Sequence, residues 1–298
     1  MAETVLLTGA SGLIGRYVHR MLRERGDKVV AIDRIEGDDV LACDLSEVHR
    51  LHELGSEAAA IIHCGAISGP MVARDNPYLI VQSNIVGTAN VLEFARVKGM
   101  RRVVYCSSVS AFGNTPAGLD LVPEDVVLKP TSVYGASKAA GEQLLEGYRQ
   151  QHGVDSVSLR PGWVYGPGRT TDCAIRTMIE DAQAGRPTSF PFGRDFYRQY
   201  VHVQDVADAI LLALDAKELP RRSYTINGGT YLTLGDVAAI VRKVLPSARI
   251  EMGPGGDPID DVQARFDLSA AERDLGFRPR IGLEEGIRSY AGWLSARR

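Results

Sequence analysis

The sequence has no long hydrophobic run and no excess of charge of either sign. Its longest weakly polar stretch, residues 58–67, is far too short to cross a bilayer and contains His63. A formal net charge of -3 over 298 residues gives no sign of a nucleic-acid or membrane-surface partner. The N-terminus also lacks a basic leader followed by a long apolar segment, so we expect a soluble, cytoplasmic protein without a secretion signal.

Cysteine is scarce as well, with four residues in the whole chain. They form no Cys-x-x-Cys pair, which argues against a zinc site and a disulfide framework. His49 and His52 lie three residues apart in a predicted exposed helix, but no third ligand accompanies them, so we expect no metal. Reduced thiols are expected at the four positions, which are Cys43, Cys64, Cys106 and Cys173.

What the sequence does contain is a regular alternation of short β-rich runs and longer helical patterns. The β-rich runs are apolar on both faces, which is typical of parallel strands covered by helices on both sides. The pattern predicts an α/β protein with a Rossmann-type doubly wound parallel sheet. Thr233 and Asp267 stand at the N-cap positions of two later helices. We expect strands at 4–8, 28–33, 59–64, 102–107 and 156–160, and helices at 13–25, 46–54, 77–98, 132–152 and 171–185.

A glycine-rich stretch, "TGASGLIG", follows the first strand and opens the first helix. Gly9, Gly12 and Gly15 let the backbone approach a pyrophosphate, with Leu13 and Ile14 between the last two glycines, and the positive end of the helix stabilises the anion. A tight turn with a close helix crossing is the plainer alternative. The order of strand, glycines and helix favours a dinucleotide site.

An acidic residue at the end of the second strand indicates which dinucleotide binds. Asp33 stands eighteen residues beyond Gly15, where a carboxylate accepts both ribose hydroxyls of an adenosine and repels a 2′-phosphate. A solvated turn aspartate is the alternative. We therefore expect NAD, and NADP is less favoured, although Arg34 beside the acid would tolerate a phosphate.

Hydride transfer also needs a group that moves a proton. Tyr134 and Lys138, four residues apart on a predicted helix, share one face, and an ammonium near a phenol favours the phenolate, which makes Tyr134 a candidate general base. Such a pair is also common on protein surfaces. Ser107 and Ser108 follow a strand at the carboxyl edge of the sheet, where ligands bind, and Ser108 is positioned to orient the reacting oxygen.

The pattern becomes irregular after the fifth strand, with short strands near 199–203 and 223–227. Residues 1–165 are the expected NAD-binding Rossmann domain, with a soft boundary. Residues 166–298 are expected to form mainly a smaller C-terminal substrate-binding lobe, with some segments returning to the Rossmann core.

These motifs together resemble the extended short-chain dehydrogenases/reductases of the NAD-dependent epimerase/dehydratase family. The resemblance covers nearly the whole chain, including "CDL", "HCGA", "CSSVSAFG", "YGASK", "RPGWVYGPG" and "RQYVHVQDVA". It implies a catalytic set of Ser108, Tyr134 and Lys138, with Lys138 also holding the nicotinamide ribose. It further implies cofactor contacts from Asp44, Leu45, Cys64, Gly65, Ala66, Asn84, Ser107 and Pro161.

Departures from the family pattern narrow the chemistry. Sugar dehydratases of the family carry an Asp-Glu pair where this chain has Val109 and Ser110, so we set elimination aside. Nucleotide-sugar enzymes of the family tend to hold the diphosphate with two arginines. Arg198 is one candidate, but the stretch 253–263, where the other is expected, carries three aspartates and no arginine.

The expected substrate contacts are less specific. Residues 168–179 resemble a segment of the family's L-threonine dehydrogenases, which take a small substrate, and a threonine N-cap on a helix is the alternative. Trp163 and Tyr165 line the pocket or pack between the lobes. Arg198 binds a substrate anion or forms a surface salt bridge. The expected contacts are Ser68, Ser108, Tyr134, Trp163, Thr171 and Arg198.

Three functions follow from this pattern. The first is an NAD-dependent oxidoreductase acting on a secondary alcohol or ketone of a small polar substrate, such as a sugar, a sugar acid or a hydroxy acid. The alternative is a nucleotide-sugar 4-epimerase with transient oxidation by tightly bound NAD. A non-catalytic NAD-binding sensor is a minor third, because fold alone does not establish activity.

Two long helices are candidates for an oligomer contact. Helices 77–98 and 132–152 carry apolar residues on more than one face. Related enzymes pair these two helices across a two-fold axis, so we expect a homodimer. Burial in the core of the monomer is the alternative.

Overall fold

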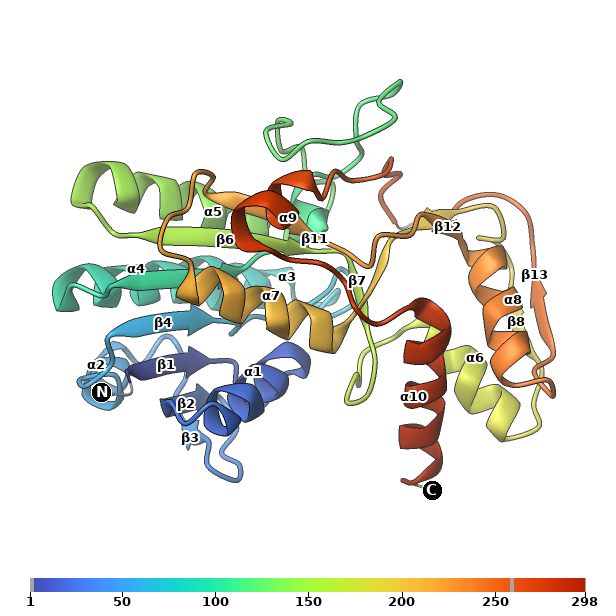
Figure 1. Ribbon diagram of the computed structural model, residues 1–298, viewed down its shortest axis with the longest axis horizontal. Coiled ribbons are helices and arrows are strands. Elements are labelled where there is room, and N and C mark those ends of the chain that lie inside the picture. The colour runs from blue at the N-terminus through green and yellow to red at the C-terminus, as the bar shows by residue number, and fades with distance from the viewer. Residues whose placement is uncertain (1–2, 258–259, 298) are drawn as a thin grey trace.

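A seven-stranded parallel sheet forms the centre of the fold in the computed structural model, which describes residues 3–257 and 260–297. Its strands are β1 (Thr4–Thr8), β2 (Lys28–Asp33), β3 (Leu41–Ala42), β4 (Ala60–His63), β5 (Arg102–Cys106), β6 (Ser156–Pro161) and β11 (Ser223–Ile226). They lie in the order β11-β6-β5-β4-β1-β2-β3 (Figure 1). The chain winds outward in both directions from β1 and β4, which confirms the expected doubly wound sheet.

The inner strands are buried on both faces, as their apolar sequences predict. Leu6 and Ile61 point to one side, while Leu7 and Ile62, the next residues along the same strands, point to the other. Successive residues thus enter two different cores. Helices α2 (Val48–Leu54), α4 (Gly87–Lys98) and α5 (Val133–His152) cover one face, and α1 (Leu13–Glu24) and α7 (Val203–Asp215) cover the other.

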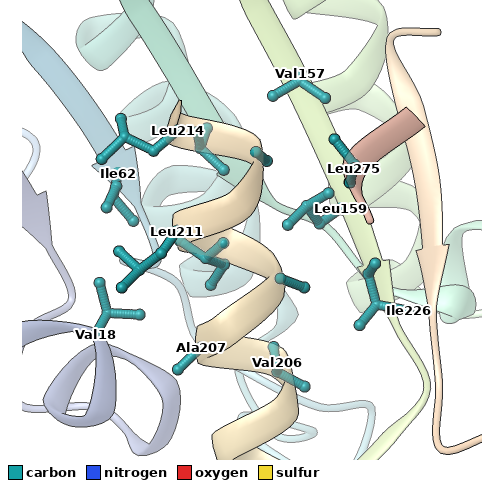
Figure 2. Close-up of a cluster of buried hydrophobic side chains, with 14 of the residues drawn as sticks. Val18, Ile62, Val157, Leu159, Val206, Ala207, Leu211, Leu214, Ile226 and Leu275 are labelled. Carbon is teal, nitrogen blue, oxygen red and sulfur yellow. The ribbon is translucent and has the colours of Figure 1, made fainter. Parts of the chain in front are cut away.

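Helix α7 lies across the sheet, and its apolar face fills the larger core (Figure 2). Val206, Ile210 and Leu214 repeat every four residues and are fully buried or nearly so. Burying such a side chain contributes roughly 1.5–3 kcal/mol. Figure 2 shows α7 facing residues Val18, Ile62, Val157, Leu159, Ile226 and, from α9 (Ser269–Leu275), Leu275.

A second cluster of elements lies beside the sheet domain (Figure 1). Its core contains Ile175, Met178, Val237, Val241 and Ile287. The packed elements are α6 (Ala174–Gln183), α8 (Leu234–Val244), α10 (Leu283–Ser295) and the parallel pair β8 (Thr188–Phe190) and β13 (Ile250–Met252). Two further pairs are β7 (Trp163–Tyr165) with β10 (Tyr200–His202) and β9 (Tyr197–Arg198) with β12 (Leu232–Thr233).

One expected helix is divided in the structure, and one expected strand is found in the central sheet. The helix expected at 77–98 is α3 (Pro77–Ile80), a π-helical segment over Val81–Val86, and α4. The strand expected near 223–227 pairs with β6 in the central sheet, because β11 follows α7 back to the edge of that sheet. This part of the chain therefore belongs to the sheet domain and not to the second cluster.

Three helix N-caps were expected from the sequence, and the structure has one of them. Thr233 caps α8 in a reciprocal arrangement with Asp236. The helix expected at 171–185 begins after Cys173, which has no side-chain cap bond, so the threonine-cap interpretation of that segment is wrong. At α9 the N-cap is Leu268, and Asp267 instead accepts a hydrogen bond from the Ser269 amide at 2.8 Å.

The close packing of α5 on β5 gives a stability prediction. A Cβ added at Gly141 would lie 2.4 Å from the hydroxyl oxygen of Tyr105, which is buried and has no room to move. Gly141→Ala is expected to lower the free energy of unfolding by about 1–3 kcal/mol, as overpacked cores do. Gly147→Ala, on the same helix with open space around it, is expected to raise it by up to about 1 kcal/mol. Urea unfolding of both variants checks this, and equal effects would contradict it.

Candidate active site

A cavity of about 360 Å³, here called the main cavity, lies at the carboxyl ends of β1, β4 and β5. Gly9, Gly12 and Gly15 line one end of it. A Cβ on Gly9 would lie 2.5 Å from the Gly65 nitrogen, and one on Gly15 would lie 2.0 Å from the Gly9 oxygen. Gly12 precedes α1 without a side-chain cap, so the first amides of α1 can receive an anion.

Asp33 connects the glycine loop to the end of β2. One carboxylate oxygen accepts a hydrogen bond from the Ser11 amide at 3.0 Å, and the other accepts one from the Arg34 amide at 2.7 Å. Arg34 lines the main cavity, and Asp33, the residue before it, is not among the lining residues. Leu13, Ile14, Cys64, Ala66, Ser107 and Pro161 also line the main cavity.

Four other residues expected at the cofactor lie outside the cavity wall. The Asn84 side chain bonds both the amide and the carbonyl of Ile67, at 2.8 and 3.0 Å, and Ile67 lines the main cavity. Asn84 thus fixes the loop after β4. Leu45 packs against Gly65 and Gly87. The four are Asp44, Leu45, Gly65 and Asn84.

The start of α5 places Tyr134 beside the end of β5. Ser132 caps the helix, accepting a bond from the Gly135 amide at 3.0 Å. A Cβ on Gly135 would lie 2.3 Å from the Ser110 carbonyl oxygen, so glycine lets the helix approach this turn closely. Ser108 caps the short 3₁₀ turn Val109–Ala111. Tyr134 and Ser108 both line the main cavity and are largely buried.

Lys138 lies one turn further along α5, and its buried ammonium is held in place. It donates a 2.6 Å hydrogen bond to the Cys106 carbonyl oxygen. Its nitrogen is 4.9 Å from the ring centroid of Tyr105 and 6.0 Å from that of Tyr134. Burial lowers the pKa of Lys138, but the hydroxyl and thiol groups around it, Tyr105 first, outweigh burial and hold that pKa above its usual value. Lys138 is therefore a cation in the cavity wall.

A neutral, buried histidine lies close enough to Lys138 to feel its charge. His63 is buried between Thr8 and Thr88, with ring nitrogens 2.7 and 3.0 Å from their hydroxyl oxygens. Burial, aided by Lys138, lowers the pKa of His63 to about 3. Its arrangement between two hydroxyl groups is that of a structural residue.

A buried ion pair supports the active-site wall from behind. Glu142, on α5, bonds the Arg160 guanidinium at 2.5 Å and accepts a 2.5 Å bond from the Ser107 hydroxyl. Arg160 also donates to the Glu124 carbonyl oxygen at 2.7 Å. These contacts join α5, β5 and β6 at the residues next to Ser108.

A second compartment of about 340 Å³ adjoins the main cavity, and the two share Pro70, Met71 and Trp163. Arg198 lies in it and is paired with Asp260 at 2.7 Å and with Asp257 at 2.9 Å. Burial raises the pKa of Asp260 to about 6, although Arg198 opposes this. The surface salt bridge expected as an alternative for Arg198 is a buried one. The compartment is also lined by Arg74, Asp172, Cys173, Thr177, Phe190, Phe192, Phe196 and Leu234.

The expected substrate contacts are divided between these spaces. Ser68, Trp163 and Thr171 line the main cavity with Ser108 and Tyr134. Arg198 lines the second compartment and not the main cavity. Tyr165 is fully buried against Tyr200 and His202, as its packing alternative implied. Wall residues that the sequence reasoning missed are Ser110, Arg169, Thr170 and the loop residues Gly69, Pro70, Met71 and Val72. This loop follows β4. Its place after the carboxyl end of a parallel strand is the sequence signal that could have identified these residues.

Within residues 3–257 and 260–297, no three His, Cys, Asp or Glu side chains gather as metal ligands. None of the helices in these ranges combines the length and the apolar character of a membrane span.

The parallel sheet, the glycine loop and the tyrosine-lysine pair define an enzyme of the extended short-chain dehydrogenase/reductase type. Residues 5–227 match the NAD dependent epimerase/dehydratase family, and the chain belongs to that family.

Relatives along nearly the whole chain carry epimerase and reductase names. UDP-glucuronate 4-epimerase 1 of Arabidopsis thaliana is 27% identical over 97% of this chain and 76% of its own length. A dTDP-4-dehydro-6-deoxy-D-allose reductase of a Streptomyces species is 30% identical, covering 97% and 96%. The UDP-glucose 4-epimerase of Thermus thermophilus, solved with NAD, has a TM-score of 0.87 at 28% identity, covering 98% and 99%. The relatives thus favour the epimerase alternative over the net dehydrogenase.

The ion pair behind the wall gives a second prediction. Glu142→Gln leaves the buried Arg160 without a charge partner and is expected to lower the free energy of unfolding by about 3–5 kcal/mol. Glu146→Gln, one turn along the same helix, removes an exposed pair with Arg149 and is expected to cost at most about 0.5 kcal/mol. Denaturant titration of the two variants measures both values, and similar losses would refute the role of Glu142.

Proposed function

We propose that this chain is an NAD-dependent epimerase, which oxidises a secondary alcohol carbon of a sugar to a ketone and then returns the hydride. The observation that carries the proposal is that Ser108, Tyr134 and Lys138 line one end of a cavity whose other end is a glycine loop. The names of two relatives, both UDP-sugar 4-epimerases, support return of the hydride.

The glycine end of the main cavity has the features of a dinucleotide site. The close backbone packing that requires glycine at positions 9 and 15, and the uncapped start of α1, support binding of the pyrophosphate there. Asp33 and Arg34 are proposed to contact the adenosine ribose, and Cys64, Ala66, Ser107 and Pro161 the nicotinamide half. NAD supplies the hydride acceptor.

The other end of the main cavity is proposed to handle the proton. Ser108 donates a hydrogen bond to the substrate oxygen and orients it. Tyr134 takes the proton of that hydroxyl group as general base and gives it back when the ketone is reduced. Lys138, held by Cys106, stabilises the negative charge that develops on the phenol oxygen. Ser68, Trp163 and Thr171 are proposed to position the sugar.

A net dehydrogenase acting on a small polar alcohol is the second candidate. The pairing of Arg198 with Asp257 and Asp260 supports it, because a small substrate needs no free arginine beyond the main cavity. One relative's name also describes a reductase.

The two candidates differ in the fate of the hydride. The enzyme with NAD is offered UDP-glucose, UDP-glucuronate, free aldoses, sugar acids and threonine, while NADH absorbance and the products are followed. An epimer without net NADH is the expected result, and stoichiometric NADH would establish the dehydrogenase.

The general base is tested in the same assay. Tyr134→Phe is expected to lower kcat by about 10²–10⁴-fold while NAD still binds, because only the proton acceptor is lost. Tyr148→Phe changes a tyrosine of the same helix outside the cavity and should leave kcat unchanged. Full activity in Tyr134→Phe would exclude the mechanism and revive the non-catalytic sensor.

Cofactor preference tests the role of Asp33. Asp33→Asn removes the charge that repels a 2′-phosphate, so NADH should bind about tenfold or more weakly and the preference over NADPH should shrink. Glu36→Gln, exposed nearby, is the matched control and should change neither affinity. Fluorescence titration with NADH and NADPH measures this, and tighter NADPH binding by the unmodified enzyme would contradict it.

A homodimer through α3, α4 and α5 remains part of the proposal. Large apolar side chains are exposed on these helices and the π-helical segment between them, which supports a partner there. The exposed residues are Tyr78, Val86, Val97 and Val133.

The proposed location is the cytoplasm. Four free cysteines support such a reducing compartment.

A further inference from the structure

The interior of the second compartment carries more negative than positive charge. Its charged side chains are two arginines and three aspartates, so one negative charge is in excess. Arg74 and Asp172 are exposed at the rim and balance each other. Among the described lining residues, the charges inside are therefore those of Asp257 and Asp260, which face Arg198.

Arg198 is already engaged by two carboxylates. Its Nε and Nη2 atoms already bond the two carboxylates, at distances of 2.7–2.9 Å. Its guanidinium carbon lies 4.3 Å from the ring centroid of Trp163 and 5.4 Å from that of Phe196. The side chain is buried between charged partners and aromatic rings, so it is neutralised and fixed within the protein.

A large substrate has to enter this compartment. A dinucleotide at the glycine loop fills one end of the main cavity, and the reacting carbon must lie near Tyr134 at the other. The second compartment continues from that end, past Met71 and Trp163. Any part of the substrate beyond the reacting sugar therefore meets Arg198 and its two aspartates.

The substrates named for the relatives carry a diphosphate next to the sugar, in the part of the molecule that would enter the second compartment. UDP-glucose, UDP-glucuronate and dTDP-linked sugars each join the sugar to a nucleoside through two phosphates. In this chain such a group would have to displace the carboxylates from Arg198 or lie against them. Like charges at close range are unfavourable, more so where water is excluded.

We propose that Asp257 and Asp260 are specificity-determining residues, which make the second compartment reject a nucleoside diphosphate and accept a neutral or cationic group, as in an unactivated sugar or an amino sugar. The inference rests on the proposed function for the hydride chemistry but not on whether the hydride is returned. The raised pKa of Asp260 agrees with it, because burial first, and then the neighbouring carboxylates Asp257 and Asp261, disfavour negative charge in this place.

Binding of UDP and of uridine to the NAD-loaded enzyme, measured by calorimetry, tests the proposal. The two probes differ only in the diphosphate. The unmodified enzyme should bind UDP no more tightly than uridine, or not detectably. Asp257→Asn with Asp260→Asn frees Arg198, and UDP affinity should rise by about tenfold or more, since a charge-assisted contact is gained, with uridine unchanged.

Two further variants keep the test decisive. Asp257→Asn alone retains the Asp260 partner of the buried arginine, so it is expected to fold, and it should shift UDP affinity in the same direction. Asp261→Asn is the matched control on the same segment, because Asp261 bonds Thr131 and does not line the second compartment; it should leave both affinities unchanged.

The proposal is overturned if the unmodified enzyme binds UDP about tenfold or more tightly than uridine, or if UDP affinity stays the same without the aspartates. Failure of the proposed function looks different. In that case no sugar is turned over, or Tyr134→Phe stays active, whatever the ratio of UDP to uridine binding.

Discussion

The attachment of α5 to the ends of β5 and β6 by buried charges is the interaction on which the active site depends. Lys138 bonds the backbone of Cys106, and Glu142, one turn further, joins Arg160 to Ser107. Since both contacts converge on the residues just before Ser108, the distance between helix and strand is fixed from the protein side. The serine and tyrosine hydroxyl groups thus take their relative positions before any substrate arrives, which is what preorganisation requires.

Features that depend on local order could be predicted from the sequence. The strand and helix alternation, the glycine loop and the Tyr134 and Lys138 spacing are each written within a few residues, and the doubly wound sheet follows from them. Features that depend on pairing across the chain could not. Arg198 meets aspartates about sixty residues further along. A return of later segments to the sheet domain was expected, but the pairing of β11 with β6 at the sheet edge was not.

The resemblance to the family predicts the position of Arg198 but not its partners. The residue matches the family pattern, yet its partners are supplied by a segment that differs from the pattern, and those partners change what the guanidinium can bind. The glycine loop and the tyrosine-lysine pair, by contrast, lie in the sheet domain, within the residues that match the family. The residues proposed for the chemistry and those proposed for selectivity thus come from separate parts of this chain.

The π-helical segment between α3 and α4 has a consequence for how this helix evolves. A wider turn accommodates one residue more than a regular helix, and each residue of an α-helix accounts for about 100° of rotation. Within this segment Asn84 faces inward to the loop after β4, while Tyr78 and Val97, on either side, are exposed. A single-residue deletion here would turn the side chains upstream of it by about 100° relative to those downstream, so chain length in this segment is constrained.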